Sequence, residues 1–381
     1  MKYRPFGQLN WQASALGFGC MRLPILEEDS GKIDEPLATA MIRHAIDAGV
    51  NYIDTAWGYH REQSEPFIGR VLKDGYREKV RLATKLPSWL VHSQDDMERL
   101  LDTQLARLQT DQIDFYLLHS MNAKYWQNYQ DLHIFDWAEK KMAEGKFRYL
   151  GFSFHDKVDV FESILNGYDN WTLCQIQYNY MDVNEQAGIK GLRAAAGKGL
   201  AVVVMEPLRG GSLVKTPPVV AEQFKDSNRD WTPAEWALQW VWNQPEVSLL
   251  LSGMSTMEQV QQNLASADHS GVGSLTQTDL GLIENVRAAR ASLAPVPCTH
   301  CEYCLPCPND VAIPSIFEIY NQAVMYDDQN NGRNRYKDAI HEENRADRCV
   351  ECGTCESLCP QHIQIIEWLK TADAYLAPGL P

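Results

Sequence analysis

The stretch DFYLLHS (114–120) sets the first expectation about the fold. It is short, apolar on both faces and polar at its end, which is typical of a strand in a parallel sheet covered by helices. Seven further runs of this kind are separated by longer helical patterns: ALGFGCM (15–21), NYIDTA (51–56), VRLATKL (80–86), FRYLGFSF (147–154), LCQIQYN (173–179), LAVVVMEP (200–207) and VSLLLSG (247–253). Eight β/α units in about 265 residues predict a (β/α)8 TIM barrel.

A doubly wound sheet is the alternative, but about six strands would suffice for it. No G-x-G-x-x-G follows any predicted strand. GLRAAAGKG (191–199) resembles a P-loop, but it is one residue too long and lies on a helix that leads into a strand. Two helices begin with capping boxes, at Thr232–Glu235 and Ser255–Glu258, and Ser93 with Asp96 is a weaker one.

The chain is long enough, at 381 residues, for a second domain. A helix over 275–293 is followed by the Pro-rich junction APVP (294–297), so we expect a barrel over residues 1–294 and a smaller domain over 295–381. Helical patterns at 314–326, about 327–348 and about 364–376 predict that the smaller domain is mainly α-helical.

Charge and hydropathy exclude several classes of partner. The net charge of −15 argues against nucleic acid and anionic membrane surfaces. Residues 295–381 contain 13 acidic and 6 basic residues, a net charge of −7. The N-terminus MKYRPFGQLNW has no apolar signal segment, and no apolar run is long enough to cross a bilayer, so we expect a cytoplasmic protein.

Polar side chains fall where three successive predicted strands end. Asp54 ends the second run, Tyr59 follows it, Lys85 ends the third run and His119 ends the fourth. In a TIM barrel these ends meet at one face, where reactive groups lie. Because an isolated buried charge is very costly, the Lys and Asp are expected to pair. Taken singly, each residue is more often structural than catalytic.

Together the four side chains suggest proton transfer. The Lys85 ammonium should lower the pKa of Tyr59, which is about 10 in water. Such a tyrosine can give a proton to a carbonyl oxygen as a hydride reaches the carbon. Asp54 would neutralise and orient Lys85, and His119 would hold the carbonyl oxygen. The alternative is a structural Asp–Lys pair with a packed Tyr and His.

The chain resembles the aldo-keto reductase superfamily over about residues 1–270. The matching stretches, in the family's order, are GFGCM (17–21), IDTAWGY (53–59), ATKL (83–86), YLLHS (116–120), GFS (151–153), QIQYN (175–179), EPLRGG (206–211) and LSGMSTMEQVQQN (251–263). The resemblance implies the catalytic tetrad Asp54, Tyr59, Lys85 and His119, a carbonyl or alcohol substrate, and NAD(P)H bound without a Rossmann fold.

The resemblance also implies a cofactor site. Ser153 and Gln175 would hold the nicotinamide carboxamide, with Gly19 and Cys20 beside the ring. The loop across the pyrophosphate would be formed by Leu208, Arg209, Gly210, Gly211 and Lys215. The adenosine-phosphate end would be formed by Ser255, Gln259, Gln262 and Asn263.

Three positions depart from the family pattern. Met205 stands where an aromatic often stacks on the nicotinamide, and Phe154 stands where an Asn usually follows Ser153. The cations that many members use for the 2′-phosphate are absent around 253–259, so NADP is expected with NAD as the alternative. Arg209 and Lys215 are the candidate contacts for that phosphate.

Aromatic residues near the strand ends are candidates for the substrate pocket, with ordinary packing as the alternative. They are Trp57, Trp89, Tyr125 and Trp126. Cys174, inside a strand, is expected to be a small buried hydrophobe.

The remaining eight cysteines form two runs. CVECGTCESLCP (349–360) has the spacing C-x2-C-x2-C-x3-C-P of bacterial [4Fe–4S] ferredoxins, and CTHCEYCLPCP (298–308) is one residue shorter before its last Cys. Two zinc sites, each with four cysteine ligands, are the alternative, but zinc sites usually use separated pairs. The smaller domain therefore resembles a ferredoxin-type module, a fusion seen in a branch of microbial aldo-keto reductases.

In two-cluster ferredoxins the fourth Cys of each run binds the other cluster. One predicted cluster is therefore held by Cys298, Cys301, Cys304 and Cys359. The other is held by Cys349, Cys352, Cys355 and Cys307.

The fusion leaves three functional interpretations. The first is an oxidoreductase whose clusters exchange electrons with a partner protein that has a basic surface. The second is a carbonyl reductase with structural or oxygen-sensing clusters. The third is a nucleotide-binding redox sensor without catalysis. A hydride carries two electrons and a cluster accepts one, so coupling them normally needs a flavin, for which the sequence shows no motif.

Overall fold

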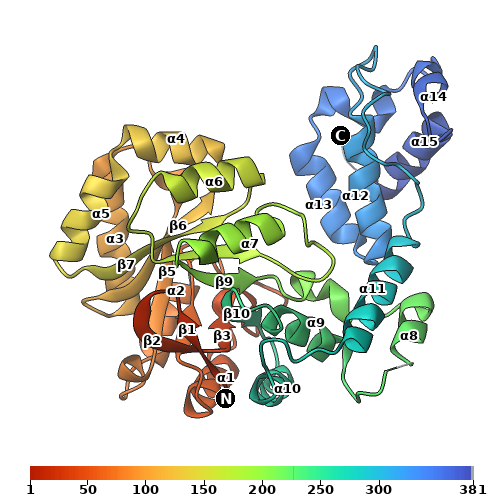
Figure 1. Cartoon of the computed structure of the whole chain (residues 1–381). Coiled ribbons are helices and arrows are strands. Elements are labelled where there is room, and N and C mark those ends of the chain that lie inside the picture. The colour runs from red at the N-terminus through yellow and green to blue at the C-terminus, as the bar shows by residue number, and fades with distance from the viewer. Residues whose placement is uncertain (226, 379–381) are drawn as a thin grey trace. The chain divides into compact units, whose positions relative to one another are not determined.

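The computed structural model describes residues 1–225 and 227–378. They form two compact units (Figure 1). The first comprises Met1–Gly210 and Ala234–Thr276, and the second comprises the described parts of Gly211–Pro233 and Gln277–Pro381. This division lies earlier in the chain than the predicted domain boundary after residue 294, which stays a prediction. None of the helices in the described ranges is both long and apolar enough to cross a membrane.

The first unit is a closed parallel barrel, as the sequence predicts. Its strands are hydrogen-bonded in the order β10-β3-β4-β5-β6-β7-β8-β9. They are β3 (Leu16–Gly19), β4 (Tyr52–Asp54), β5 (Arg81–Leu86), β6 (Ile113–Met121), β7 (Phe147–Phe154), β8 (Leu173–Gln177), β9 (Ala201–Met205) and β10 (Val247–Gly253). All eight apolar runs are therefore confirmed as strands, because a strand covered on both faces needs apolar residues at successive positions.

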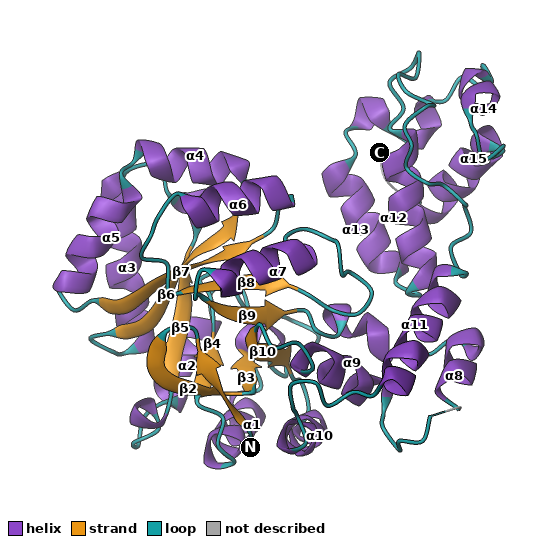
Figure 2. Ribbon diagram, viewed as in Figure 1, coloured by secondary structure: helices purple, strands orange, loops and turns teal. Residues whose placement is uncertain are grey.

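Helices surround these strands, which are orange in Figure 2. They are α1 (Glu35–Asp47), α2 (Ser64–Val71), α3 (Gln94–Leu108), α4 (Ala123–Asp131), α5 (Ile134–Ala143), α6 (Val158–Asn166), α7 (Gly188–Gly197), α9 (Pro233–Trp242) and α10 (Met257–Asp268). Short 3-10 turns are η1 (Cys20–Arg22), η2 (Arg77–Lys79), η3 (Ser88–Leu90) and η4 (Arg209–Val214).

The helix starts follow the capping patterns with one correction. Ser93 caps α3 by accepting from Asp96 N, as predicted, and α9 begins directly after Thr232. The cap of α10 is Thr256, not Ser255: the Thr256 side chain accepts from Gln259 N at 3.2 Å. The capping box is therefore shifted by one residue.

The sequence analysis does not predict the antiparallel hairpin of β1 (Tyr3–Phe6) and β2 (Leu9–Ser14). The hairpin supplies Phe6, which is fully buried and packs on Phe115 and Tyr52 at ring-centroid distances of 4.8 and 5.9 Å. These rings belong to one apolar cluster with strand residues such as Ala83 and Leu249. The hairpin thus packs against the interior of the barrel, and it leaves the strand ends that carry the polar residues accessible for a site.

The second unit is helical. It contains α8 (Pro218–Phe224), α11 (Gln277–Ala291), α12 (Ile313–Met325), α13 (Gln329–Ala339), α14 (Thr354–Leu358), α15 (Ile365–Leu376), η5 (Glu342–Asn344) and η6 (Ala346–Arg348). No strand occurs in its described residues. Its helices confirm the predicted patterns, although α13 is shorter than the range 327–348.

Two features hold the second unit together. Arg290 of α11 is fully buried and donates to the carbonyls of Lys215 and Met325, which ties residues 211–233 to the C-terminal helices. Gly332 lets α13 approach α12 closely, because a Cβ there would lie 2.5 Å from the Ala323 Cβ. Around that contact, α12, α13 and α15 enclose one apolar core.

Candidate active site

A buried lysine connects the predicted catalytic residues. Lys85 Nζ donates to Asp54 Oδ1 at 2.6 Å, to the Thr55 carbonyl at 2.9 Å and to Tyr59 OH at 3.4 Å. The Lys85 and Asp54 side chains are 1% and 2% exposed. Lys85 lies near the end of β5 and Asp54 is the last residue of β4, so neighbouring parallel strands bring the charges together. The structure therefore contains the predicted pair with Tyr59 attached to it.

His119 completes the group from the next strand, β6. Its ring lies 6.2 Å from the Tyr59 ring and 5.1 Å from the Trp89 ring, measured between centroids. Burial, with smaller contributions from the charges of Lys85 and His155, lowers the pKa of His119 well below its usual value. Its buried Nδ1 has no hydrogen-bond partner among the described residues. His119 is therefore a neutral imidazole with an unused polar atom inside the site.

The expected pKa of Tyr59 requires a correction. Lys85 does favour the phenolate, but burial has the larger effect, so the pKa of Tyr59 is raised rather than lowered. For Lys85, burial is the largest effect and disfavours the ammonium, but the charges and hydrogen bonds of Asp54 and Tyr59 together outweigh burial and raise the pKa of the amine. Burial also raises the pKa of Asp54, opposed by the charge and hydrogen bond of Lys85, and the 2.6 Å contact with the ammonium keeps Asp54 a carboxylate. The Tyr59 phenol is protonated at neutral pH.

Ser153 and Gln175, the predicted carboxamide ligands, lie on adjacent strands at paired positions. Ser153 Oγ accepts from Ser120 N at 2.8 Å, which leaves the hydroxyl hydrogen available. Gln175 is 2% exposed, and its Oε1 has no partner in the part of the chain that the structure describes. One free donor and one free acceptor side by side match the two polar groups of a primary amide.

The residues predicted beside the nicotinamide ring have contrasting environments. Gly19 ends β3, and Cys20, the first residue of η1, is fully buried. Burial, reinforced by the Asp54 carboxylate, raises the pKa of the Cys20 thiol despite Lys85, so the thiol stays protonated. Met205 ends β9 and is half-buried. Phe154 is fully buried against Phe161, so it offers no polar group in place of the family's usual Asn.

The loop predicted to cross the pyrophosphate begins with a half-buried Leu208. Arg209 Nε donates to Asp182 Oδ2 at 2.9 Å, so this cation is already paired. Gly210 and Gly211 have φ angles of +64° and +94°, which glycine adopts without strain. Lys215 Nζ donates to the Asp327 carbonyl at 2.6 Å within the second unit.

The predicted adenosine-phosphate residues lie at the start of α10. Ser255 and Gln259 are joined by a 2.8 Å hydrogen bond from Ser255 N to Gln259 Oε1. Gln262 donates to a glutamate one turn earlier on the helix at 3.0 Å. Asn263, 6% exposed, donates to the Ser252 hydroxyl at 3.0 Å. Gln262 and Asn263 therefore use their amides within the protein, whereas Ser255 is exposed.

Of the aromatic candidates for the substrate pocket, Trp89 lies against His119 and is 39% exposed. The Arg107 guanidinium lies over Trp57, with its Cζ 3.8 Å from the Trp57 ring centroid. Trp126 is buried beside Gly167. Tyr125 is half-buried on α4. Ordinary packing thus accounts for Trp126, whereas the buried Trp57 Nε1 has no hydrogen-bond partner among the described residues. Cys174 is fully buried, as predicted.

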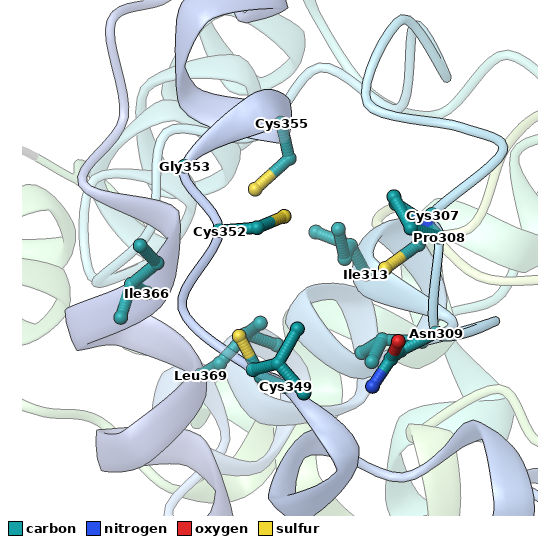
Figure 3. A pocket seen from close by; sticks show the side chains of 12 residues that line it. Cys307, Pro308, Asn309, Ile313, Cys349, Cys352, Gly353, Cys355, Ile366 and Leu369 are labelled. Atoms are coloured by element: carbon teal, nitrogen blue, oxygen red, sulfur yellow. The ribbon is translucent and has the colours of Figure 1, made fainter.

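The eight C-terminal cysteines line two separate cavities. Cys307, Cys349, Cys352 and Cys355 line the first, where Figure 3 shows their side chains around one space. Cys298, Cys301, Cys304 and Cys359 line the second. Each set combines three cysteines of one run with the last cysteine of the other, the same sets that the sequence analysis assigns to the two clusters. Their role as cluster ligands stays a prediction.

Sequence reasoning missed two residues that organise the barrel site. Ser120 adopts a φ of +54°, and its N–H binds the Ser153 hydroxyl. Asp182 holds Arg209 and is in turn bound by Gln177 and Asn179 amides at 2.9 and 3.0 Å. No sequence signal marks Ser120, because its role depends on backbone geometry. Asp182 could have been suspected from its place after the QIQYN stretch.

Comparisons with known proteins agree with this arrangement. The model of the aldo/keto reductase family matches residues 15–286, and that of a 4Fe-4S dicluster domain matches residues 297–364. The latter match favours iron–sulfur over zinc. L-galactose dehydrogenase of Arabidopsis thaliana is 26% identical over 311 residues, which cover 75% of this chain and 94% of that protein.

Two solved structures resemble the barrel. The holo form of the aldo-keto reductase AKR11C1 from Bacillus halodurans has a TM-score of 0.63 and 27% identity over 75% of this chain and 96% of its own. An aldo-keto reductase from Klebsiella pneumoniae in complex with NADPH has a TM-score of 0.60 and 25% identity over 75% and 95%. The chain therefore belongs to the aldo/keto reductase family, as an NAD(P)-dependent oxidoreductase joined to a 4Fe-4S dicluster domain.

Proposed function

We propose that the barrel transfers a hydride between NADP(H) and a carbonyl or alcohol substrate, with Tyr59 as the general acid and base. The observation that supports this best is the Lys85 ammonium between the Asp54 carboxylate, at 2.6 Å, and the Tyr59 hydroxyl, at 3.4 Å. A phenol beside a buried cation can lose its proton with a smaller penalty than a phenol in apolar surroundings.

Each side chain of the tetrad has a distinct part in the proposed reaction. NADP(H), when bound, supplies or accepts the hydride. Tyr59 donates its proton to the substrate oxygen during reduction and takes it back during oxidation. Lys85 stabilises the phenolate left behind, and Asp54 keeps Lys85 charged and in place. Neutral His119 donates a hydrogen bond to the same substrate oxygen and thereby orients the carbonyl.

The residues present fit a nicotinamide. Gln175 Oε1, buried without a partner among the described residues, would accept from the carboxamide NH2, and the Ser153 hydroxyl would donate to its oxygen. The Klebsiella relative in complex with NADPH adds support for NADP(H). NAD stays an alternative, because Arg209 and Lys215, the predicted contacts of the 2′-phosphate, are bonded to protein groups.

For the C-terminal unit we propose two [4Fe–4S] clusters, one in each cysteine-lined cavity. Four thiolates around a cavity are the donor set that such clusters require, and the clusters supply one-electron chemistry. Exposed apolar side chains lie within the runs: Tyr303, Val350 and Leu358 are 65%, 61% and 52% exposed. With the net charge of −7 over residues 295–381, they suit a redox partner with a basic surface.

A structural role for the clusters is the second candidate. Cys355 is buried within the apolar core of the C-terminal helices, and five further cysteines pack against that core. Loss of a cluster would therefore remove part of what holds these helices together. In that case the clusters need not exchange electrons with the barrel.

Two experiments test these proposals. Tyr59→Phe should reduce carbonyl turnover by about a hundredfold or more, the usual share of a general acid, with little change in NADPH affinity. Tyr76→Phe, at the barrel surface, is the matched control. Reaction of Tyr59→Phe at the parent rate would refute the role of Tyr59.

The clusters are tested by anaerobic purification, iron and sulfide analysis, and visible spectra. Electron exchange predicts that NADPH bleaches the cluster absorbance near roughly 400 nm, with or without added flavin. Absence of bleaching in both cases would leave the structural role.

A further inference from the structure

Arg22 lies where two predicted cofactor segments approach each other. A Cβ placed on Gly210 would lie 3.2 Å from Arg22 Nη2, so the guanidinium lies beside the predicted pyrophosphate loop. A Cβ placed on Gly253 would lie 3.1 Å from the Arg22 Cβ, so the stem of the side chain lies against the end of β10. Arg22 therefore links the loop after β9 with the strand that leads into α10.

The backbone of Arg22 is held in the same place. Arg22 is the last residue of η1, two residues after Cys20 and close in sequence to the predicted nicotinamide neighbours. Its carbonyl accepts a hydrogen bond from Ser255 Oγ at 2.7 Å. The side chain thus starts from a fixed backbone position at the accessible end of the barrel.

The guanidinium is not neutralised by the protein. Arg22 is exposed, and within the described ranges it has no side-chain hydrogen bond and no ion pair. The charge of Arg22 is felt by Glu206, whose pKa is raised mainly by burial and lowered first by Arg209 and then by Arg22. In a chain of net charge −15, an arginine without a partner is an exception. Arg209, in contrast, is paired with Asp182.

We infer that Arg22 binds a phosphate group of the dinucleotide and sets the affinity of the barrel for it. The inference rests on the proposed NADP(H)-dependent function. A guanidinium offers paired N–H donors in a plane and holds phosphate oxygens in a bidentate manner. Arg22 therefore offers an unpaired cation to the dinucleotide, and Gly210 and Gly253 provide the space that its side chain needs.

The test is the affinity of the full-length, anaerobically purified protein for NADPH and NADH, measured by isothermal titration calorimetry without a substrate. Arg22→Gln should weaken NADPH binding about tenfold to a hundredfold, as expected for a lost charge-assisted hydrogen bond. Arg22→Lys should recover part of the affinity. Arg193→Gln, which removes another exposed arginine of the barrel, should leave it unchanged.

The two dinucleotides identify the phosphate. Weaker binding of NADPH alone assigns Arg22 to the 2′-phosphate, and equal weakening of NADPH and NADH assigns it to the pyrophosphate. Unchanged affinity of Arg22→Gln for both would overturn the inference while the proposed function stands. If the parent protein binds neither dinucleotide, the proposed function fails first and the inference fails with it.

Discussion

The exchange of cysteines between the two runs can be tested by pairs of substitutions. Cys307 belongs to the first run but lines a cavity with Cys349, Cys352 and Cys355. If the cavities are the cluster sites, Cys307→Ala damages the cluster of the second run. A second substitution in the same cavity should then cause little further loss of iron. A second substitution in the other cavity should also damage the cluster of the first run.

The proposal of two clusters per chain gives the size of the effect. The parent protein should contain about eight iron atoms per chain. Cys307→Ala combined with Cys355→Ala should retain about four, because both residues line one cavity. Cys307→Ala combined with Cys304→Ala should retain nearly none, because Cys304 lines the other cavity. Alanine is used because serine oxygen can replace a thiolate as a ligand.

The assay is iron and sulfide analysis of anaerobically purified protein, with electron paramagnetic resonance of the reduced samples to count cluster signals. The reverse result would refute the reasoning. In that case the variant with substitutions at 304 and 307 would retain about four iron atoms, and the variant with substitutions at 307 and 355 would lose nearly all of them. That result would mean that each run binds its own cluster. Barrel turnover serves as the control for general misfolding.

Three further predictions concern the charges in the structure. Lys85→Met leaves the buried Asp54 carboxylate without its partner, so urea unfolding should show a free energy of unfolding that is lower by about 3–5 kcal/mol. Adding Asp54→Asn should recover part of this loss. A Lys85→Met protein that is more stable than the parent would contradict the prediction. Because burial raises the pKa of Tyr59, kcat/KM for carbonyl reduction should stay level up to about pH 9. An inflection near pH 8 would show that Lys85 has a larger effect than burial on that pKa. Reduction of a basic c-type cytochrome by the reduced protein should slow as salt rises and after Glu351→Lys, measured by stopped flow; a rate independent of salt would exclude charge steering.

The barrel could be predicted from sequence because its strands carry a strong local signal. Runs such as LAVVVMEP (200–207) must be apolar on both faces, and the polar residues at the ends of three successive runs indicate the face that carries the candidate site. Asp54 and Lys85 followed from this logic, because a charge at such a position needs a partner.

The N-terminal hairpin could not be predicted in the same way. Phe6 packs on rings from residues 52 and 115, which are distant in the chain, and its burial therefore depends on the completed barrel. The partners of Arg209 and Lys215 are also tertiary. Local patterns carry no information about which carboxylate or carbonyl will lie beside a loop cation.

The pKa of Tyr59 shows a further limit and clarifies what Lys85 does. The sequence indicates that a cation lies near the phenol, but burial is a property of the whole fold, and here it outweighs that cation. Lys85 is therefore not needed to produce a phenolate in the resting protein. In the proposed mechanism its charge instead lowers the free energy of the phenolate that forms when the proton moves to the substrate oxygen.

The same ammonium also disfavours protonation of His119, whose pKa is lowered by burial and by Lys85. A neutral imidazole can donate a hydrogen bond to the substrate oxygen without competing with Tyr59 as the acid. Burial thus keeps both residues that would contact that oxygen in their neutral forms, while the Lys85 ammonium, held by Asp54 at 2.6 Å, would stabilise the phenolate that forms in the proposed reaction. A lysine buried without a carboxylate would lose its proton, so Lys85 cannot stabilise the phenolate without Asp54. Asp54→Asn should therefore impair turnover, although Asp54 is not proposed to contact the substrate.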